Sequence, residues 1–390
     1  MKVLVKTCLL LTISVSAAFG AEELRLAGNL ESGPHPVGFR TETLRISPPS
    51  APQSVPVEPW PSAVELYVWY PAAGDGSTGS RMVFADYYRA QEGRSLGDVE
   101  LHERLLDDMT SPPGVDDADL GSVLTAPMWA MRDAPADDAR HPLVLWSYRD
   151  SVPTMQTLLN EYLASHGYVV AFAWPVDNAP PFPWEEGLTE TQKSEALDTQ
   201  TRLLEDVLDV MRTRPGVDAG STSVLAWSYG GESAGALQRR RADVDVVVGI
   251  DATLVSGWVY RSVEALADLD GGELSAPYAL LRNGRPRIDA PTRPEPALLR
   301  EVRAGSWFVE FPYLSHGNFN FPGGMIPGIL NLEEVSSWAV GGDAARLGYE
   351  MICRHVRGLL DHEQRGLPGD SAQWSASAPE GFVRVVRHRP

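Results

Sequence analysis

The sequence contains few cysteines, fewer basic than acidic residues and no long apolar run. Its 390 residues include two cysteines, and 33 lysines and arginines stand against 52 aspartates and glutamates, a formal net charge of −19. Because no long basic run occurs, we do not expect binding to nucleic acid or to an anionic membrane surface. No His-x-His, His-Glu-x-x-His or paired-cysteine spacing occurs, and no phosphate-cradling glycine loop, so we expect neither a metal nor a cofactor.

The N-terminus has the features of a targeting segment. Lysines precede a short, mostly apolar run, Thr7–Phe19, and the sequence Ala18-Phe19-Gly20 resembles a small-x-small cleavage site. The run is shorter than the ~18–20 residues that span a bilayer, so no stable membrane insertion is expected. We predict a signal peptide over residues 1–20, cleavage before Ala21 and a periplasmic or secreted protein. Cys353 is then the only remaining cysteine, and an internal disulfide is excluded.

Short apolar segments alternate with helical ones from His141 onward. Near-continuous apolar strands separated by helices predict a mainly parallel sheet covered on both faces, an α/β fold. The polar, acidic segment 74–140 has no clear motif, and we interpret it as an insertion in a single domain spanning residues 21–390. The expected strands are 43–46, 64–71, 142–147, 168–173, 223–227, 244–250, 277–281 and 307–311, and the main helices 155–165, 189–212 and 343–360.

A serine lies where one of these strands meets a helix. The strand Ser223–Trp227 is followed by Ser228-Tyr229-Gly230-Gly231 and then by small helix-forming residues. This layout is typical of a nucleophile elbow, G-x-S-x-G, with Ala226 in place of the first glycine. We expect Ser228 to be a nucleophile and the backbone N–H of Tyr229, at a helix N-terminus, to stabilise an oxyanion. The alternative is an ordinary serine in a strand-to-helix turn.

A nucleophilic serine needs an acid, and Asp251 is the first candidate. It directly follows the apolar strand 244–250, at the edge of the sheet where functional loops gather. A carboxylate there caps no evident helix and belongs to no charged patch. One alternative is that Asp251 is only a turn or cap residue. The other is that the acid is Asp289, which follows the next strand in a loop rich in Arg and Pro.

The base must be a histidine, and four histidines follow Asp251 in the chain. His316 lies in a turn directly after the strand 307–311, from which its imidazole can reach Ser228. His355 falls on the apolar side of the last helix and is expected to be packed, whereas His362 and His388 are expected to be solvated. His316 is therefore the predicted base.

These residues together resemble the platelet-activating-factor acetylhydrolase type of α/β-hydrolase and the dienelactone-hydrolase-like bacterial esterases grouped with it. The likeness rests on the Ser228-to-Asp251 spacing and the His316-x-Asn-Phe turn, and on the stretches 33–40, 68–72 and 163–171. It covers about residues 33–320, apart from the segment 74–140. The resemblance implies an α/β-hydrolase fold with Ser228 as nucleophile, Asp251 as acid and His316 as base. It also implies metal-independent hydrolysis of small or oxidised acyl esters.

One loop departs from the family pattern. Where the family has a His-Gly-containing loop that provides the second oxyanion donor, this chain has Ser147-Tyr148-Arg149-Asp150-Ser151. A backbone N–H near Tyr148 or Arg149, or the Tyr148 hydroxyl, is expected to take that role. Loss of one donor typically lowers turnover ~10²–10³-fold.

The sequence therefore leaves three hypotheses for function. The first is an exported serine hydrolase that cleaves small-molecule carboxylic esters through an acyl-enzyme. The second, motivated by the 147–151 loop, is a catalytically weak or inactive binding protein on the same fold. The third is a serine peptidase or amidase, because a triad does not by itself distinguish the leaving group.

Overall fold

The protein is described from a computed structural model. It describes residues 24–46, 61–74, 78–92, 96–109, 111–147, 153–176, 189–252, 274–284, 297–300, 302–333, 335–376 and 378–389. The predicted signal peptide, residues 1–20, lies outside these ranges.

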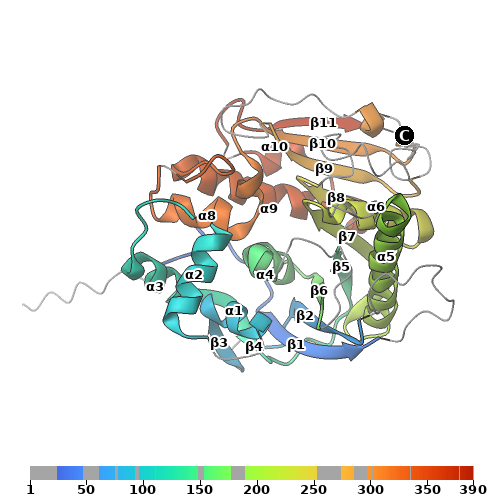
Figure 1. The fold of residues 1–390 in the computed structure, drawn as a ribbon. Coiled ribbons are helices and arrows are strands. Elements are labelled where there is room, and N and C mark those ends of the chain that lie inside the picture. Colours follow the sequence, from blue (N-terminus) through green and yellow to red (C-terminus); the bar gives the residue numbers. More distant parts are fainter. Residues whose placement is uncertain are drawn as a thin grey trace, which may run out of the picture.

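The strands among the described residues form one eleven-stranded sheet in the order β11-β10-β9-β8-β7-β5-β6-β2-β1-β4-β3 (Figure 1). From β10 to β6 each strand is parallel to the next, whereas β2, β3 and β11 pair antiparallel. The mainly parallel sheet predicted from the sequence is thus confirmed. The strands are β1 (Val37–Arg45), β2 (Ala63–Pro71), β3 (Ser80–Val83), β4 (Pro127–Arg132), β5 (His141–Trp146), β6 (Val169–Pro175), β7 (Val217–Trp227), β8 (Val246–Ile250), β9 (Tyr278–Asn283), β10 (Ser306–Phe311) and β11 (Arg384–His388).

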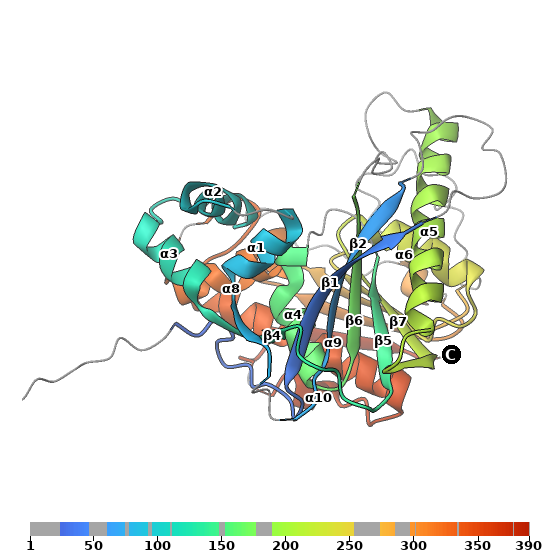
Figure 2. The same cartoon turned by 90° about the horizontal axis from the view of Figure 1, so that it is seen from below.

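Helices cover both faces of this sheet. Helices α5 and α6 lie on one side, and α4, α8 and α9 lie on the other (Figure 2). The α-helices are α1 (Ala85–Glu92), α2 (Asp98–Asp108), α3 (Asp117–Thr125), α4 (Thr157–Ser165), α5 (Glu190–Arg212), α6 (Gly230–Arg240), α8 (Phe321–Ile329), α9 (Gly342–Arg365) and α10 (Ser371–Trp374), with 3₁₀ turns at Pro153–Gln156, Ala297–Arg300 and His316–Phe319.

The central strands are apolar at consecutive positions because both of their faces are buried. In β7, Leu225 and Trp227 pack into the core on the α4–α9 side, whereas Val224 and Ala226 pack into the core on the α5–α6 side. Strands of this kind have no polar face to expose, and their sequences are therefore continuous apolar runs.

Several element boundaries differ from the sequence-based predictions. Strand β7 begins at Val217 rather than at residue 223, and β11 was not predicted at all. Helix α9 has Gly341 as its N-cap rather than Asp343, and it continues to Arg365 before ending at a left-handed Gly366. Asp343 instead lies in the first turn, where its carboxylate pairs with Arg346 at 2.9 Å.

The segment 74–140 adds β3 and β4 to the sheet edge and contributes α1, α2 and α3. One buried carboxylate joins this segment to the main body. Glu161 of α4 accepts a hydrogen bond from the Tyr87 hydroxyl of α1 and a second, of 2.7 Å, from the backbone N–H of Trp129 in β4. Burial raises the pKa of Glu161 to about 7, although both hydrogen bonds oppose that shift.

This raised pKa predicts a pH-dependent stability. The unfolded chain loses the Glu161 proton near pH 4.5 and the folded chain near pH 7, so the stabilisation is complete below pH 4.5 and is lost as pH rises through 7. The shift corresponds to roughly 3 kcal/mol. The free energy of unfolding, measured with urea, should therefore fall between pH 5 and pH 8 in wild type. The fall should be smaller in Glu161→Gln, whose side chain does not titrate. Equal losses in the two proteins would contradict the assignment.

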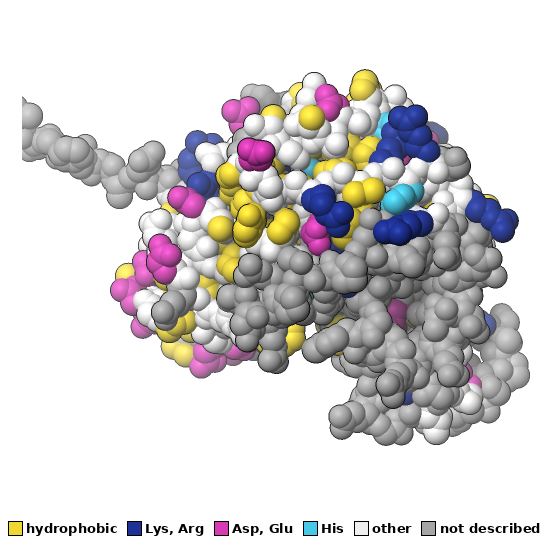
Figure 3. All heavy atoms as spheres, turned by 90° about the horizontal axis from the view of Figure 1, so that it is seen from above, with side chains coloured by type: hydrophobic (Ala, Val, Ile, Leu, Met, Phe, Trp, Pro, Cys, Tyr) yellow, Lys and Arg dark blue, Asp and Glu magenta, His cyan; other side chains and the backbone are white. Residues whose placement is uncertain are grey.

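The acidic charge of the chain is unevenly distributed. Exposed carboxylates gather on α2 and α3, including Asp98, Glu100, Asp107 and Asp117, whereas Arg384 and Arg387 are exposed on β11. On the face shown in Figure 3, acidic side chains lie mainly toward the α2–α3 side and basic ones toward the β11 side. Much of the exposed negative charge is thus carried by the segment 74–140.

Candidate active site

The candidate site lies where the order of the strands reverses. The chain passes from β5 to β6 on one side, and then returns to place β7 on the other side of β5. In open α/β sheets, ligands bind beyond the carboxyl ends of the strands at such a point. Ser147 follows β5 there and Ser228 follows β7, so the fold brings Ser228 and the first residue of the predicted oxyanion loop to the same edge.

Ser228 has a strained backbone. It follows the buried strand β7 with φ of 50°, in the left-handed region that non-glycine residues adopt at a cost of about 1–3 kcal/mol. Helix α6 then begins at Gly230 with Tyr229 as its N-cap residue. The turn therefore holds the serine between the end of β7 and the start of α6, as expected of a nucleophile elbow.

Close packing between α6 and β5 supports this turn. A side chain at Gly230 would place its Cβ 2.9 Å from the backbone oxygen of Ser147. The Ser147 hydroxyl donates to the Gly230 carbonyl at 2.7 Å and lies 2.8 Å from the Ser233 hydroxyl. Gly230, the last residue of the predicted elbow, therefore has to be small because the Ser147 backbone lies against it.

We expect Gly230→Ala to destabilise the protein by about 1–3 kcal/mol, because the new methyl group must displace Ser147. The matched control is Gly121→Ala in α3, where a Cβ would meet nothing within 4 Å. The control should stabilise by about 0.4–1 kcal/mol. Urea midpoints of the three proteins test the difference, and equal midpoints for the two variants would rule out the Ser147 contact as a constraint.

The structure brings Ser228, His316 and Asp251 together. His316 Nε2 lies 3.0 Å from Ser228 Oγ, and His316 Nδ1 lies 2.5 Å from Asp251 Oδ2. The serine and the aspartate are buried, whereas the imidazole is about one-quarter exposed. The order of contacts is that of a serine nucleophile, a base and an orienting carboxylate.

Asp251 is held from several directions. Its backbone also has positive φ, 47°, and its N–H donates to the Leu281 carbonyl at 2.7 Å. Burial alone would raise the pKa of its carboxyl. The hydrogen bond and charge of His316, the backbone N–H of Asn283 and the charge of Arg282 together outweigh burial, so the pKa lies below its ordinary value. The carboxyl therefore stays ionised at neutral pH, as an orienting acid must.

The turn that carries His316 is fixed by Asn318. The Asn318 side chain accepts from the backbone N–H groups of Ser315 and Val340 and donates to the carbonyls of Gly323 and Val340, at 2.9–3.2 Å. This network joins the turn to α8 and to the loop before α9. The Asn of the His-x-Asn-Phe sequence thus has a positioning role that the sequence did not reveal.

Sequence reasoning missed two neighbours of the three residues. The Trp227 indole stacks on the His316 imidazole, with ring centroids 5.1 Å apart and planes 9° apart. Asn283, at the end of β9, donates its backbone N–H to Asp251 Oδ1 at 3.1 Å and its side-chain N–H to Oδ2. Both contacts join residues from separate strands and loops, and no local pattern signals them.

The other three C-terminal histidines lie elsewhere. His355 is fully buried in α9, where Nδ1 lies 2.8 Å from the Met351 carbonyl, and burial lowers its pKa to about 4, so the packed histidine is confirmed. The prediction for His362 was wrong, because its ring packs against Trp307 and its Nδ1 lies 2.7 Å from the Leu367 carbonyl. His388 is half-buried in β11 rather than solvated.

The predicted oxyanion donors are only partly within the described residues. Tyr229 is the N-cap residue of α6, so its N–H lies at the positive end of the helix dipole and next to Ser228. Tyr148 and Arg149, together with the alternative acid Asp289, lie outside the described residues. The second donor therefore stays a prediction.

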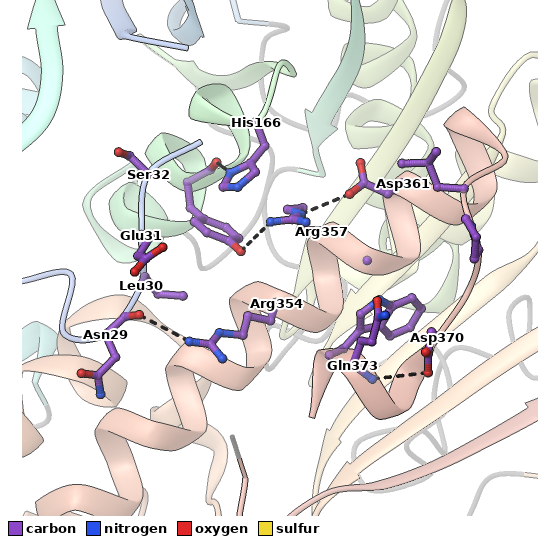
Figure 4. A pocket seen from close by; sticks show the side chains of 15 residues that line it. Asn29, Leu30, Glu31, Ser32, His166, Arg354, Arg357, Asp361, Asp370 and Gln373 are labelled. Atoms are coloured by element: carbon purple, nitrogen blue, oxygen red, sulfur yellow. Dashed lines mark hydrogen bonds and ion pairs between the residues drawn. The ribbon is translucent and has the colours of Figure 1, made fainter. Parts of the chain in front are cut away.

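A cavity of about 730 Å³ lies at the other end of the sheet, between α4, α9 and the segment 29–32. Figure 4 shows Arg357 turned toward Asp361, and Arg354 turned toward Asn29. Arg357 donates to Asp361 at 3.1 Å and to the Tyr162 hydroxyl at 3.2 Å. Because the carboxyl-terminal end of α4 lines the cavity just before β6 begins, the cavity lies at the amino ends of the strands. It is not part of the candidate site.

Two kinds of feature are absent from the described residues. No helix there is both long and apolar enough to cross a membrane. No three His, Cys, Asp or Glu residues in that part of the chain are grouped so as to hold a metal ion.

Comparison with known proteins identifies the fold. No protein-family model matches the chain, and no curated protein matches it. Among solved structures, the chain is similar to a ferulic acid esterase from Streptomyces cinnamoneus, with a TM-score of 0.58 and 20% sequence identity over 90% of this chain and 96% of that one. At that identity the likeness concerns the fold alone. Together with the parallel sheet and the elbow at its reversal point, it shows that the chain adopts the α/β-hydrolase fold.

Proposed function

We propose that the protein is an exported serine hydrolase that cleaves carboxylic esters. The observation that carries the proposal is the continuous contact from Ser228 through His316 to the ionised Asp251. The similarity to a structure named as a ferulic acid esterase supports an ester as the substrate class. Residues 1–20 serve as the export signal in this proposal.

The reaction proceeds in two steps. His316 Nε2 accepts the Ser228 proton while Oγ attacks the ester carbonyl carbon, and the carbonyl oxygen becomes an oxyanion. The Tyr229 N–H and a donor from the 147–151 loop bind that oxyanion. The imidazolium then gives its proton to the departing alcohol, which leaves an acyl-enzyme on Ser228. Water deprotonated by His316 attacks the acyl-enzyme and releases the acid.

The surroundings of His316 suit the change of charge in this reaction. Asp251 fixes the tautomer with its proton on Nδ1, which leaves Nε2 free to accept from the serine. The Trp227 ring lies face to face with the imidazole, so its π electrons lie against the positive charge that forms in the transition state. Both contacts stabilise the imidazolium more than the neutral ring.

The substrate class is tested with the mature protein beginning at Ala21. We expect hydrolysis of p-nitrophenyl esters between acetate and octanoate, with the chain-length profile reporting the size of the acyl site. Methyl ferulate tests whether an aromatic acyl group is accepted, and matched anilides test amide cleavage. Faster cleavage of anilides than of esters would favour a peptidase or amidase. Absence of turnover on every compound would favour a binding protein on this fold.

A further inference from the structure

Asn283 is a neighbour of the candidate residues Ser228, His316 and Asp251, and it contacts Asp251 in two ways. It is the last residue of β9 and is only 2% exposed. Its backbone N–H donates to Asp251 Oδ1 at 3.1 Å, and its side-chain amide donates to Oδ2. Oδ2 is also the oxygen that faces His316 Nδ1 at 2.5 Å. One residue thus contacts both oxygens of the buried carboxylate.

The position of Asn283 follows from strand pairing. Strands β8 and β9 are parallel, with Ile250 opposite Leu281, so the residues that follow emerge side by side at the carboxyl edge. The sequence offered a second location for the acid after β9, and the chain has an amide at the end of that strand. An amide provides a donor to Asp251, whereas a carboxylate there would repel it.

The contacts explain how Asp251 stays ionised although it is buried. A buried carboxylate without partners takes up a proton rather than keeping its charge. Asp251 faces two charged or titratable groups, His316 and Arg282, and it receives N–H donors from Asn283. Both donors of Asn283 are neutral, and its side-chain amide is the one that contacts Oδ2, the oxygen facing His316.

We propose that Asn283 is a positioning residue for ester hydrolysis: its side-chain amide holds the Asp251 carboxylate turned toward His316. This inference rests on the proposed function, because it assigns a role within the same reaction. Asn283 acts through Asp251 and touches no reacting atom.

The first test compares Asn283→Leu and Asn283→Asp with wild type. Leucine retains the volume and the backbone donor but removes the side-chain donor, so kcat should fall about 10- to 100-fold while KM changes less than about threefold. In Asn283→Asp, two touching carboxylates share one proton at low pH, and the protonated carboxyl of the new side chain replaces the amide donor. This variant should have about one-third or more of wild-type kcat near pH 5.5. It should fall to the level of the leucine variant near pH 8.5, where the shared proton is lost and the carboxylates repel.

The matched control is Asn160→Leu, since Asn160 is also a buried asparagine, bound to Trp146 at 2.7 Å and not to Asp251. Its kcat should stay within about twofold of wild type at both pH values. The proposal is overturned if kcat of Asn283→Leu stays within twofold of wild type or falls no further than kcat of Asn160→Leu. It is also overturned if kcat of Asn283→Asp, divided by kcat of wild type, is the same at both pH values.

A spectroscopic measurement separates this inference from the proposed function. The proton between His316 Nδ1 and Asp251 should give a low-field ¹H NMR signal in wild type and in Asn160→Leu, and the signal should weaken or move upfield in Asn283→Leu. If the signal changes in Asn283→Leu but the wild-type protein hydrolyses no ester, the positioning of Asp251 by Asn283 is supported and the proposed esterase function is rejected. An unchanged signal in Asn283→Leu would reject the positioning role even in an active esterase.

Discussion

Ser228→Ala is expected to lower kcat for ester hydrolysis about 10⁶-fold. The reason is that, in the proposed mechanism, the serine oxygen is the atom that forms the acyl-enzyme. His316 Nε2, now 3.0 Å from Ser228 Oγ, would lose its proton donor. The remaining rate would come from substrate binding and the oxyanion donors alone.

Steady-state kinetics of Ser228→Ala and of Ser122→Ala, an exposed serine in α3, test this expectation. The control should keep wild-type kcat. The alanine variant should fold like wild type, because the strained backbone at this position has the same cost with either side chain. A Ser228→Ala protein with more than about one-hundredth of wild-type kcat would show that the serine is not the nucleophile.

Asp251→Asn is expected to lower kcat about 10⁴-fold. An asparagine in this position has one carbonyl oxygen for two sets of donors, from His316 and from Asn283. Its amide group would turn toward one of them and either favour the wrong imidazole tautomer or leave the ring unheld. The imidazolium formed during the reaction would also lose its counter-charge.

The Asp251 prediction is checked by kcat for Asp251→Asn beside Asp289→Asn, the acid that the sequence left as a competitor. The first should lose about four orders of magnitude and the second less than about threefold. The opposite pattern would place the acid at residue 289. Because the pKa of Asp251 is already depressed in the folded protein, its contribution to stability is present above its ordinary pKa of 3.8 and is lost as pH falls through the lower folded value.

The sequence predicted the parts of the candidate site that are local in the chain. Ser228 and Gly230 follow an apolar strand in a short motif, and His316 follows another strand at a fixed edge of the sheet, so the order of elements was enough to bring them together. The contacts of Asn283 and Trp227 depend instead on which strands are neighbours and on where each ring faces. Those facts arise only when the whole sheet is assembled.

Other misses have equally physical reasons. Strand β11 is short and rich in arginine, and its residues are at most half-buried, so it lacks the apolar run by which the central strands are recognised. The long side chains of Arg384 and Arg387 cover aromatic rings of β10 instead, at 5.1 and 4.4 Å from the ring centroids. His362 was misjudged for a different reason: its partner Trp307 comes from a strand that is distant in the sequence.

Covalent labelling of the mature protein with a fluorophosphonate, followed by peptide mapping, tests directly whether Ser228 is an activated nucleophile. Such a probe reacts with a serine whose hydroxyl is activated by an adjacent base. We expect a single adduct on Ser228 in wild type, with labelling lost in Ser228→Ala and slowed by orders of magnitude in His316→Ala. A folded wild-type protein that takes up no label, or takes it up at another serine, would contradict the assignment of this site as a serine hydrolase centre.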